Sequence, residues 1–160
     1  MTTLLSRVAA SAGLTIALVV VTLSTRAAAS LGGDLASIQA DQVRVQGAVI
    51  PVTAAGDYGV HEMRSSSGIT VREYVSPAGR VFAVTWQGPT LPDLRQLLGD
   101  YFAPYTQAVQ AARKSRAGHG PLRIETPALV VEQSGHPRAF TGRAYLPPLL
   151  PARVAPQTIR

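Results

Sequence analysis

Cysteine is absent from this 160-residue chain, and its absence excludes several classes of protein. Zinc-finger sites, thiol redox centres and cysteine nucleophiles all need the missing side chain. Disulfide bonds are excluded as well, so any folded domain must be stabilised by packing alone.

Lysine and aromatic residues are scarce. Lys114 is the single lysine, and phenylalanine, tryptophan and tyrosine together make up 6% of the chain. The arginines are scattered, apart from a cluster of Arg113, Lys114 and Arg116, and we attribute their excess over lysine to genomic base composition. Proteins that bind nucleic acids concentrate cations in one stripe and place aromatic side chains between them. The sequence therefore predicts no nucleic-acid partner.

Motifs that mark catalytic or metal sites are also missing. No serine lies in a G-x-S-x-G elbow or an S-x-x-K motif, and no glycine-lysine phosphate loop is present. The three histidines, His61, His119 and His136, are not spaced with a carboxylate as zinc ligands are. We therefore predict no catalytic, cofactor-binding or metal-binding residue, and no cofactor.

Three polar residues are the best candidates if the chain does have an active site. Glu62 and Glu73 are expected to face each other across adjacent strands, where paired carboxylates can perform acid–base chemistry, and His61 lies beside them. Arg64 and Arg72 are close by, however, and such glutamates more commonly form a solvated, salt-bridged face. We favour that structural interpretation.

The first 29 residues have the pattern of a secretory signal peptide. Arg7 precedes an uncharged, apolar-rich run of 18 residues, and Arg26 leads into three alanines at 27–29. An uncleaved anchor is the alternative, but spanning a membrane needs about 20 predominantly apolar residues, and this run is diluted by serine, glycine and threonine. We expect a periplasmic or secreted protein, cleaved near Ala29, that contacts the membrane only if the segment is kept.

Removal of residues 1–29 leaves 131 residues, which suffice for one domain with a real core. The two arginines of the leader are lost with it, so the net charge falls from +6 to +4. We divide the rest into an irregular N-terminal arm at 30–57, a domain at 58–146 and a proline-rich tail at 147–160.

Alternating patterns predict the strands of the domain. Residues 58–64, 69–76 and 80–87 are expected to be strands, and a Ser-Pro-Ala-Gly turn at 76–79 joins the last two. Phe82, Val84 and Trp86 should share the buried face of the third strand. Further strands are predicted at 122–126, 128–133 and 138–146, with a turn at 134–137.

A long helix is predicted between residues 91 and 116, because leucine, tyrosine and alanine recur there at helical spacing. Thr90 is the expected N-cap. Pro104 should kink or break the helix near Phe102, and Arg113, Lys114 and Arg116 should complement its carbonyl end.

The tail has a different character. Residues 146–151 include three prolines and favour an extended, polyproline-like segment. Its aliphatic side chains favour packing back onto the domain over a free docking segment. The fold class is therefore α+β: an antiparallel sheet of hairpins packed on one long, kinked helix, with an irregular N-terminal arm and a proline-rich C-terminal tail.

Two segments carry a resemblance to a known family. They are residues 71–89, which end in Trp86-Gln87-Gly88-Pro89, and residues 92–102. Together with the Leu-Gly-Gly-Asp start at 31–34 and the segment 142–147, they resemble the small exported bacterial proteins catalogued as domain of unknown function 2844. The resemblance covers nearly all of the mature chain and implies export and a single domain, but no activity, ligand or catalytic residue.

We expect a non-enzymatic binding or accessory module of the bacterial envelope, whose partner is an unknown envelope protein or ligand. Two alternatives stay open. One is a small periplasmic enzyme with a cleft between helix and sheet that uses His61, Glu62 and Glu73. The other is an assembly protein that donates a strand or its proline-rich tail.

The cleavage prediction can be checked directly. Because small side chains at 27–29 fit the signal-peptidase pocket, the exported protein should begin at Ser30. N-terminal sequencing of protein from the periplasmic or culture fraction measures this. Recovery only from membranes, with Met1 retained, would establish the anchor instead.

Overall fold

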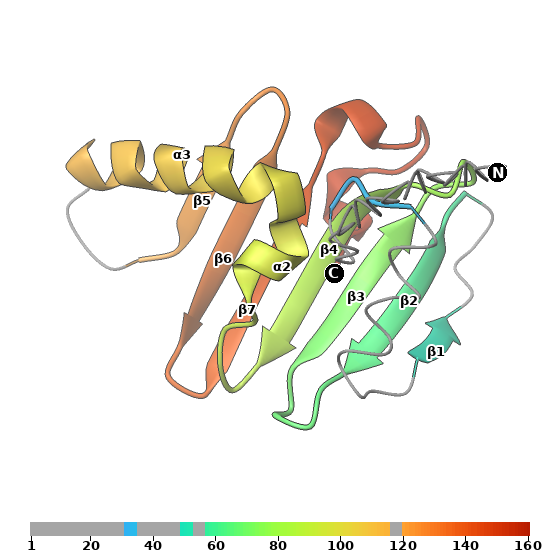
Figure 1. The fold of residues 1–160 in the computed structure, drawn as a ribbon, viewed down its shortest axis with the longest axis horizontal. Coiled ribbons are helices and arrows are strands. Elements are labelled where there is room, and N and C mark those ends of the chain that lie inside the picture. Colours follow the sequence, from blue (N-terminus) through green and yellow to red (C-terminus); the bar gives the residue numbers. More distant parts are fainter. Residues whose placement is uncertain (1–30, 35–48, 53–56, 116–119) are drawn as a thin grey trace, which may run out of the picture.

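Seven antiparallel strands form one sheet in the part of the chain that the computed structural model describes, residues 31–34, 49–52, 57–115 and 120–160 (Figure 1). In chain order the strands are β1 (Val49–Val52), β2 (Gly59–Arg64), β3 (Thr70–Val75), β4 (Val81–Gly88), β5 (Leu122–Glu125), β6 (Val130–His136) and β7 (Ala139–Tyr145). One helical segment lies between β4 and β5, which confirms the α+β class.

The strand order is β1-β2-β3-β4-β7-β6-β5, so β4 pairs with β7 and not with the next strand in the sequence. β4 therefore lies at the middle of the sheet, and β1 and β5 form its edges. Pro51 lies in β1, at an edge, where a residue without an N–H group does not interrupt the sheet.

The turn at 76–79 forms as predicted. The N–H of Gly79 donates to the carbonyl of Ser76 at 2.9 Å, and the φ of 74° at Gly79 explains why glycine is placed there. The turn predicted at 134–137 lies further along the chain, because β6 continues to His136 and β7 begins at Ala139. Arg138, with a φ of 74°, occupies that turn.

The long helix is broken into α2 (Leu94–Leu98), a 3-10 turn η1 (Gly99–Tyr101) and α3 (Phe102–Ser115). The predicted break is present, but its cause is different. Gly99 turns the chain with a φ of 51°, whereas Pro104 lies in the first turn of α3, where its missing N–H has no helical partner to lose.

The start of the helix was also predicted too early. Asp93 is the N-cap and not Thr90, since its side chain accepts hydrogen bonds from the backbone N–H groups of Arg95 (2.9 Å) and Gln96 (3.3 Å). At the other end, Arg113 and Lys114 lie in the last turn of α3, and Arg116 is outside the described residues.

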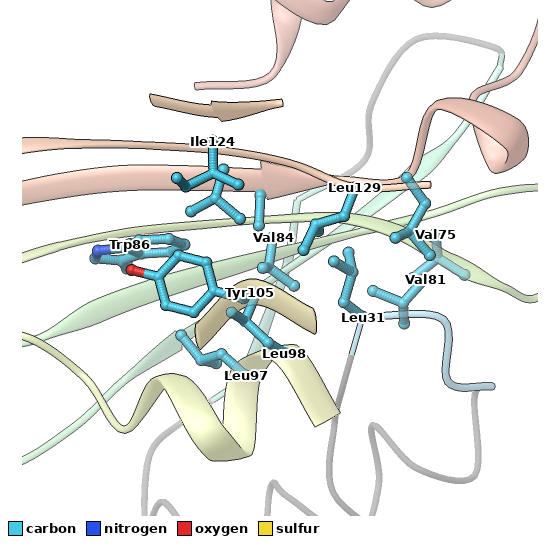
Figure 2. Close-up of a cluster of buried hydrophobic side chains, with 13 residues drawn as sticks. Leu31, Val75, Val81, Val84, Trp86, Leu97, Leu98, Tyr105, Ile124 and Leu129 are labelled. Carbon is cyan, nitrogen blue, oxygen red and sulfur yellow. The ribbon is translucent and has the colours of Figure 1, made fainter. Parts of the chain in front are cut away.

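One face of the sheet, called the helix face here, packs against α2 and α3. Figure 2 shows Trp86 near Tyr105 and Leu97, in the same cluster as Val84 and Leu98. Trp86 is 2% exposed, which confirms its predicted burial against the helix. Burial raises the pKa of the Tyr105 hydroxyl and the charge of Arg113 acts against this, so the group is protonated at neutral pH.

A β-bulge overturns part of the prediction for β4. Val75 pairs with Val81, but Tyr74 pairs with Ala83, so Phe82 is an extra residue in the register. The bulge brings Val81 to the helix face, with Val84 and Trp86, and sends Phe82 to the opposite face. Alternation read from the sequence is interrupted at this one residue.

The opposite face, called the tail face here, carries a second apolar cluster. Its buried residues are Val60, Tyr74, Phe82, Ala83, Val130, Tyr145, Val154 and Ile159. Val154 and Ile159 come from the tail, and Ile159 is only 1% exposed. The tail therefore packs back onto the sheet, and β4 is covered on both faces.

Short 3-10 turns replace the extended tail that the prolines suggested. They are η2 (Pro147–Leu149) and η3 (Pro156–Thr158), each with proline in its first positions. The fixed φ of proline suits the first turn of a helix, which gives these segments their shape.

Residues of the predicted N-terminal arm also contribute to the fold. Leu31 is 2% exposed within the helix-face cluster, and its N–H donates to the carbonyl of Leu97 at 3.0 Å. Gly32 and Gly33 exchange backbone hydrogen bonds with Val81. The predicted signal segment, residues 1–29, lies outside the described residues, among which no helix is long and apolar enough to span a membrane.

Gly142 should be intolerant of any side chain. A Cβ atom there would lie 2.3 Å from Cζ2 of Trp86 and 2.9 Å from the carbonyl oxygen of Glu132. Gly142→Ala should therefore lower the free energy of unfolding by about 1–3 kcal/mol. Gly59→Ala is the control, because nothing lies within 4 Å of its Cβ position, and should change it by less than about 0.5 kcal/mol. Urea unfolding measures both, and equal values would contradict the packing described.

Candidate functional site

The tail face is organised in three rows that run across the strands. Residues directly opposite in an antiparallel sheet point to the same face, so the register defines each row. The apolar row is Val60, Tyr74, Ala83, Tyr145 and Val130; the charged row is Glu62, Arg72, Thr85, Arg143, Glu132 and Arg123; the polar row is Thr70, Gln87, Thr141 and Ser134. The tail covers the apolar row, and the charged row lies at its border.

The charged row is symmetrical about Thr85. On one side Glu62 accepts from Nε of Arg72 at 2.8 Å and from Nε of Arg64 at 3.2 Å. On the other side Glu132 accepts from Nε of Arg143 at 2.7 Å. Each glutamate is thus shared between two arginines, since Arg123 also pairs with Glu132. The arrangement places two guanidinium groups on each side of the buried Thr85.

Arg143 fixes the tail to the sheet. Its Nη1 donates to the carbonyl of Pro156 at 2.8 Å and to that of Ile159 at 3.2 Å, while its other nitrogens bond Glu132. Tyr74 adds a further link, because its hydroxyl accepts from the N–H of Arg160 at 3.0 Å. The donors of Arg143 are therefore consumed within the fold.

Arg123 closes the row at the edge strand β5. Its side chain bonds Glu125 at 2.9 Å and also pairs with Glu132. The hydrogen bond to Glu125 and the charges of both glutamates raise the pKa of Arg123, so it stays cationic. Pairs as exposed as this one contribute little to stability but do fix the side chain's position.

A hollow of about 640 Å³ lies beside the tail, over the charged and polar rows. Its lining includes four arginines, Arg72, Arg123, Arg143 and Arg160, against one acid, Glu132. A second depression shares Thr70, Gln87 and Thr141 with it, so the hollow continues toward the hairpin ends. Its volume falls within the range of about 300–1,000 Å³ that small-molecule sites occupy.

The floor of the hollow has hydrogen-bonding capacity that the fold does not use. The side chains of Thr70, Gln87, Thr141 and Ser134 form no hydrogen bond with any described residue. Arg72 also has spare donors, because Nε bonds Glu62 while Nη1 reaches only the backbone oxygen of Arg160, at 3.5 Å. The site can bind polar and anionic groups.

The predicted pair of facing carboxylates does not form. Glu62 lies opposite Arg72, whereas Glu73 lies opposite His61 and Val84, so the two glutamates point to opposite faces of the sheet. Each residue has one direct partner on the neighbouring antiparallel strand, and adjacent residues within a strand point to opposite faces. The salt bridges predicted for Glu62 are present, with Arg64 and Arg72 as its partners, but Glu62 is buried and not on a solvated face.

His61 and Glu73 are instead cross-strand neighbours. They belong to the face of β3 and β4 that carries Val84, and Glu73 is completely buried. A side chain with no exposed surface offers no access to a substrate. Among the described residues no group of three or more histidine, aspartate or glutamate side chains could hold a metal ion.

The comparisons with known proteins agree with the resemblance drawn from the sequence. The model of a family described as protein of unknown function DUF2844 matches residues 27–159. The chain belongs to this family. No curated protein and no solved structure matches it significantly.

The hollow of this DUF2844 domain was missed by reasoning on the sequence. A signal was present, because polar residues recur two apart in four strands, as in Thr70 with Arg72 and Thr85 with Gln87. The pairing of β4 with β7 was needed to join these residues into one surface. That pairing is not local in the sequence.

Arg143 should be essential for holding the tail. Arg143→Gln removes its hydrogen bonds to Glu132, Pro156 and Ile159, and should lower the free energy of unfolding by about 1.5–3 kcal/mol. Arg153→Gln is the matched control, since Arg153 is exposed in the same tail and bonds no described residue. Equal melting temperatures of the two variants would contradict the anchoring role.

Proposed function

We propose that this DUF2844 domain is an exported, non-enzymatic binding module of the bacterial envelope that holds an anionic ligand in the hollow of the tail face. The observation that supports this most directly is the lining, which combines four arginines with a floor of unused hydrogen-bonding side chains. Export rests on the signal pattern of residues 1–29.

The charge of the hollow selects the sign of the ligand. Glu132 neutralises part of the cationic lining, but Arg72 and Arg160 keep donors that bond nothing among the described residues. A guanidinium group matches a carboxylate or phosphate in shape and can bind it through two parallel hydrogen bonds. An anion at this point would replace solvent around groups that the fold leaves unpaired.

Binding is favoured over catalysis because the hollow lacks the groups that chemistry needs. Its lining contains no histidine, and its one carboxylate, Glu132, is paired with Arg143 and Arg123. His61 and Glu73, the candidates for an enzyme, point to the other face. Val154 and Ile159 are buried in the second cluster, so the tail is not favoured as a free docking segment.

A titration with citrate tests the proposal. The amide resonances that shift should belong to β3, β4 and β7, around Arg72, Gln87 and Thr141, and the affinity should fall as salt is added. Arg72→Gln should weaken binding about tenfold, because it removes one charge-assisted contact.

Arg64→Gln is the matched control for this experiment. Arg64 pairs with the same glutamate as Arg72 but does not line the hollow. Its replacement should leave the citrate affinity unchanged. Shifts centred on Arg113 and Lys114, or equal losses in the two variants, would show that the hollow is not the site.

A further inference from the structure

The polar row indicates which chemical class of ligand the hollow binds, on the assumption that the proposed function is correct. We infer that the hollow takes a linear acidic glycan, which lies across strands β3, β4, β7 and β6 with one carboxylate at Arg72. The floor and the cationic wall each support this class of ligand.

The side chains of the floor are best matched by ligand groups that both donate and accept hydrogen bonds. Thr70, Thr141 and Ser134 carry hydroxyl groups, and Gln87 carries an amide, so each side chain has both capacities. A sugar hydroxyl has both as well. A phosphate or a carboxylate only accepts, so a ligand made of such groups alone would leave the acceptors of the floor without partners.

The floor is also long. Its four side chains come from four neighbouring strands, and strands are about 4.8 Å apart, so the row extends over roughly 14 Å. A single small anion reaches one or two of these positions. An oligomer with hydroxyl groups on every unit can meet all four.

The cationic wall places the acidic group at one end of the row. Arg72 lies two residues after Thr70 on the same face of β3, and Arg160 lies beside it at the end of the tail. The Nε of Arg160 bonds the carbonyl of Gln157 at 3.3 Å, which leaves its two Nη groups for a ligand. Arg143 positions the tail and does not need to contact the ligand.

Trp86 is the one aromatic residue among the described residues that line the hollow, but its ring lies in the helix-face cluster and is not stacked on the floor. The Trp86 ring packs on Gly142 at the helix face, and Tyr74 and Tyr145 are buried in the cluster beneath the tail. Nucleobases and apolar ligands depend on such stacking or on apolar walls. Affinity must come from charge and hydrogen bonds, which a neutral glycan supplies only in part.

Three trimeric probes test the inference by calorimetry on the purified protein. They are trigalacturonate, its neutral counterpart trigalactose, and triglutamate, which carries the same charges on a peptide. Trigalacturonate should bind about tenfold more tightly than trigalactose, because it adds the carboxylate contact. It should also bind more tightly than triglutamate, which lacks the hydroxyl groups.

Thr141→Val removes one hydroxyl from the floor at nearly constant volume. The affinity for trigalacturonate should fall about fivefold. Thr90→Val is the matched control, since Thr90 is exposed outside the hollow, and should have no effect. Circular dichroism verifies that both variants are folded.

The outcomes separate the glycan inference from the proposed function. If citrate binds in the hollow but triglutamate binds as tightly as trigalacturonate, the site recognises acidic peptides and the glycan inference is wrong. Unchanged trigalacturonate affinity in Thr141→Val would overturn it as well. If neither citrate nor any trimer binds, the proposed function itself fails.

Discussion

The antiparallel register around β4 is the constraint on which the rest of the structure depends. β4 is buried on both faces, with α2 and α3 on one side and the tail on the other. Each residue of β4 therefore faces either the helices or the tail and must pack against that layer. The residues paired with it in β3 and β7 point to the same face. The charged row lies where the apolar cover of the tail ends, because ionised side chains need partners or water there.

Local patterns predicted the parts of the fold that depend on local physics. Strands β2 to β4, the turn at 76–79 and the burial of Trp86 follow from side-chain alternation and turn chemistry. The face of the sheet on which Phe82 lies could not be predicted from alternation, because the bulge adds one residue to the register. The helix break was expected from Pro104, yet Gly99 causes it, since a proline in a first turn is harmless.

The site was less predictable than the fold because it is assembled from distant segments. Glu62 was correctly assigned to a salt-bridged face, but Glu73 was placed on the wrong side of the sheet relative to it. Arg143 and Glu132 received no role from the sequence, although they connect the sheet to the tail and to the hollow. Only the pairing of β4 with β7 brings them beside Thr85.

The position of the tail at the end of the sequence has a consequence for the order in which the fold can form. Val154 and Ile159 follow every strand in the sequence, yet they belong to the second cluster. A growing chain can form all seven strands while Tyr74 and Phe82 still lack the cover that these residues provide. Without residues 154–159 the apolar cluster around Tyr74 and Phe82 would therefore be exposed to solvent.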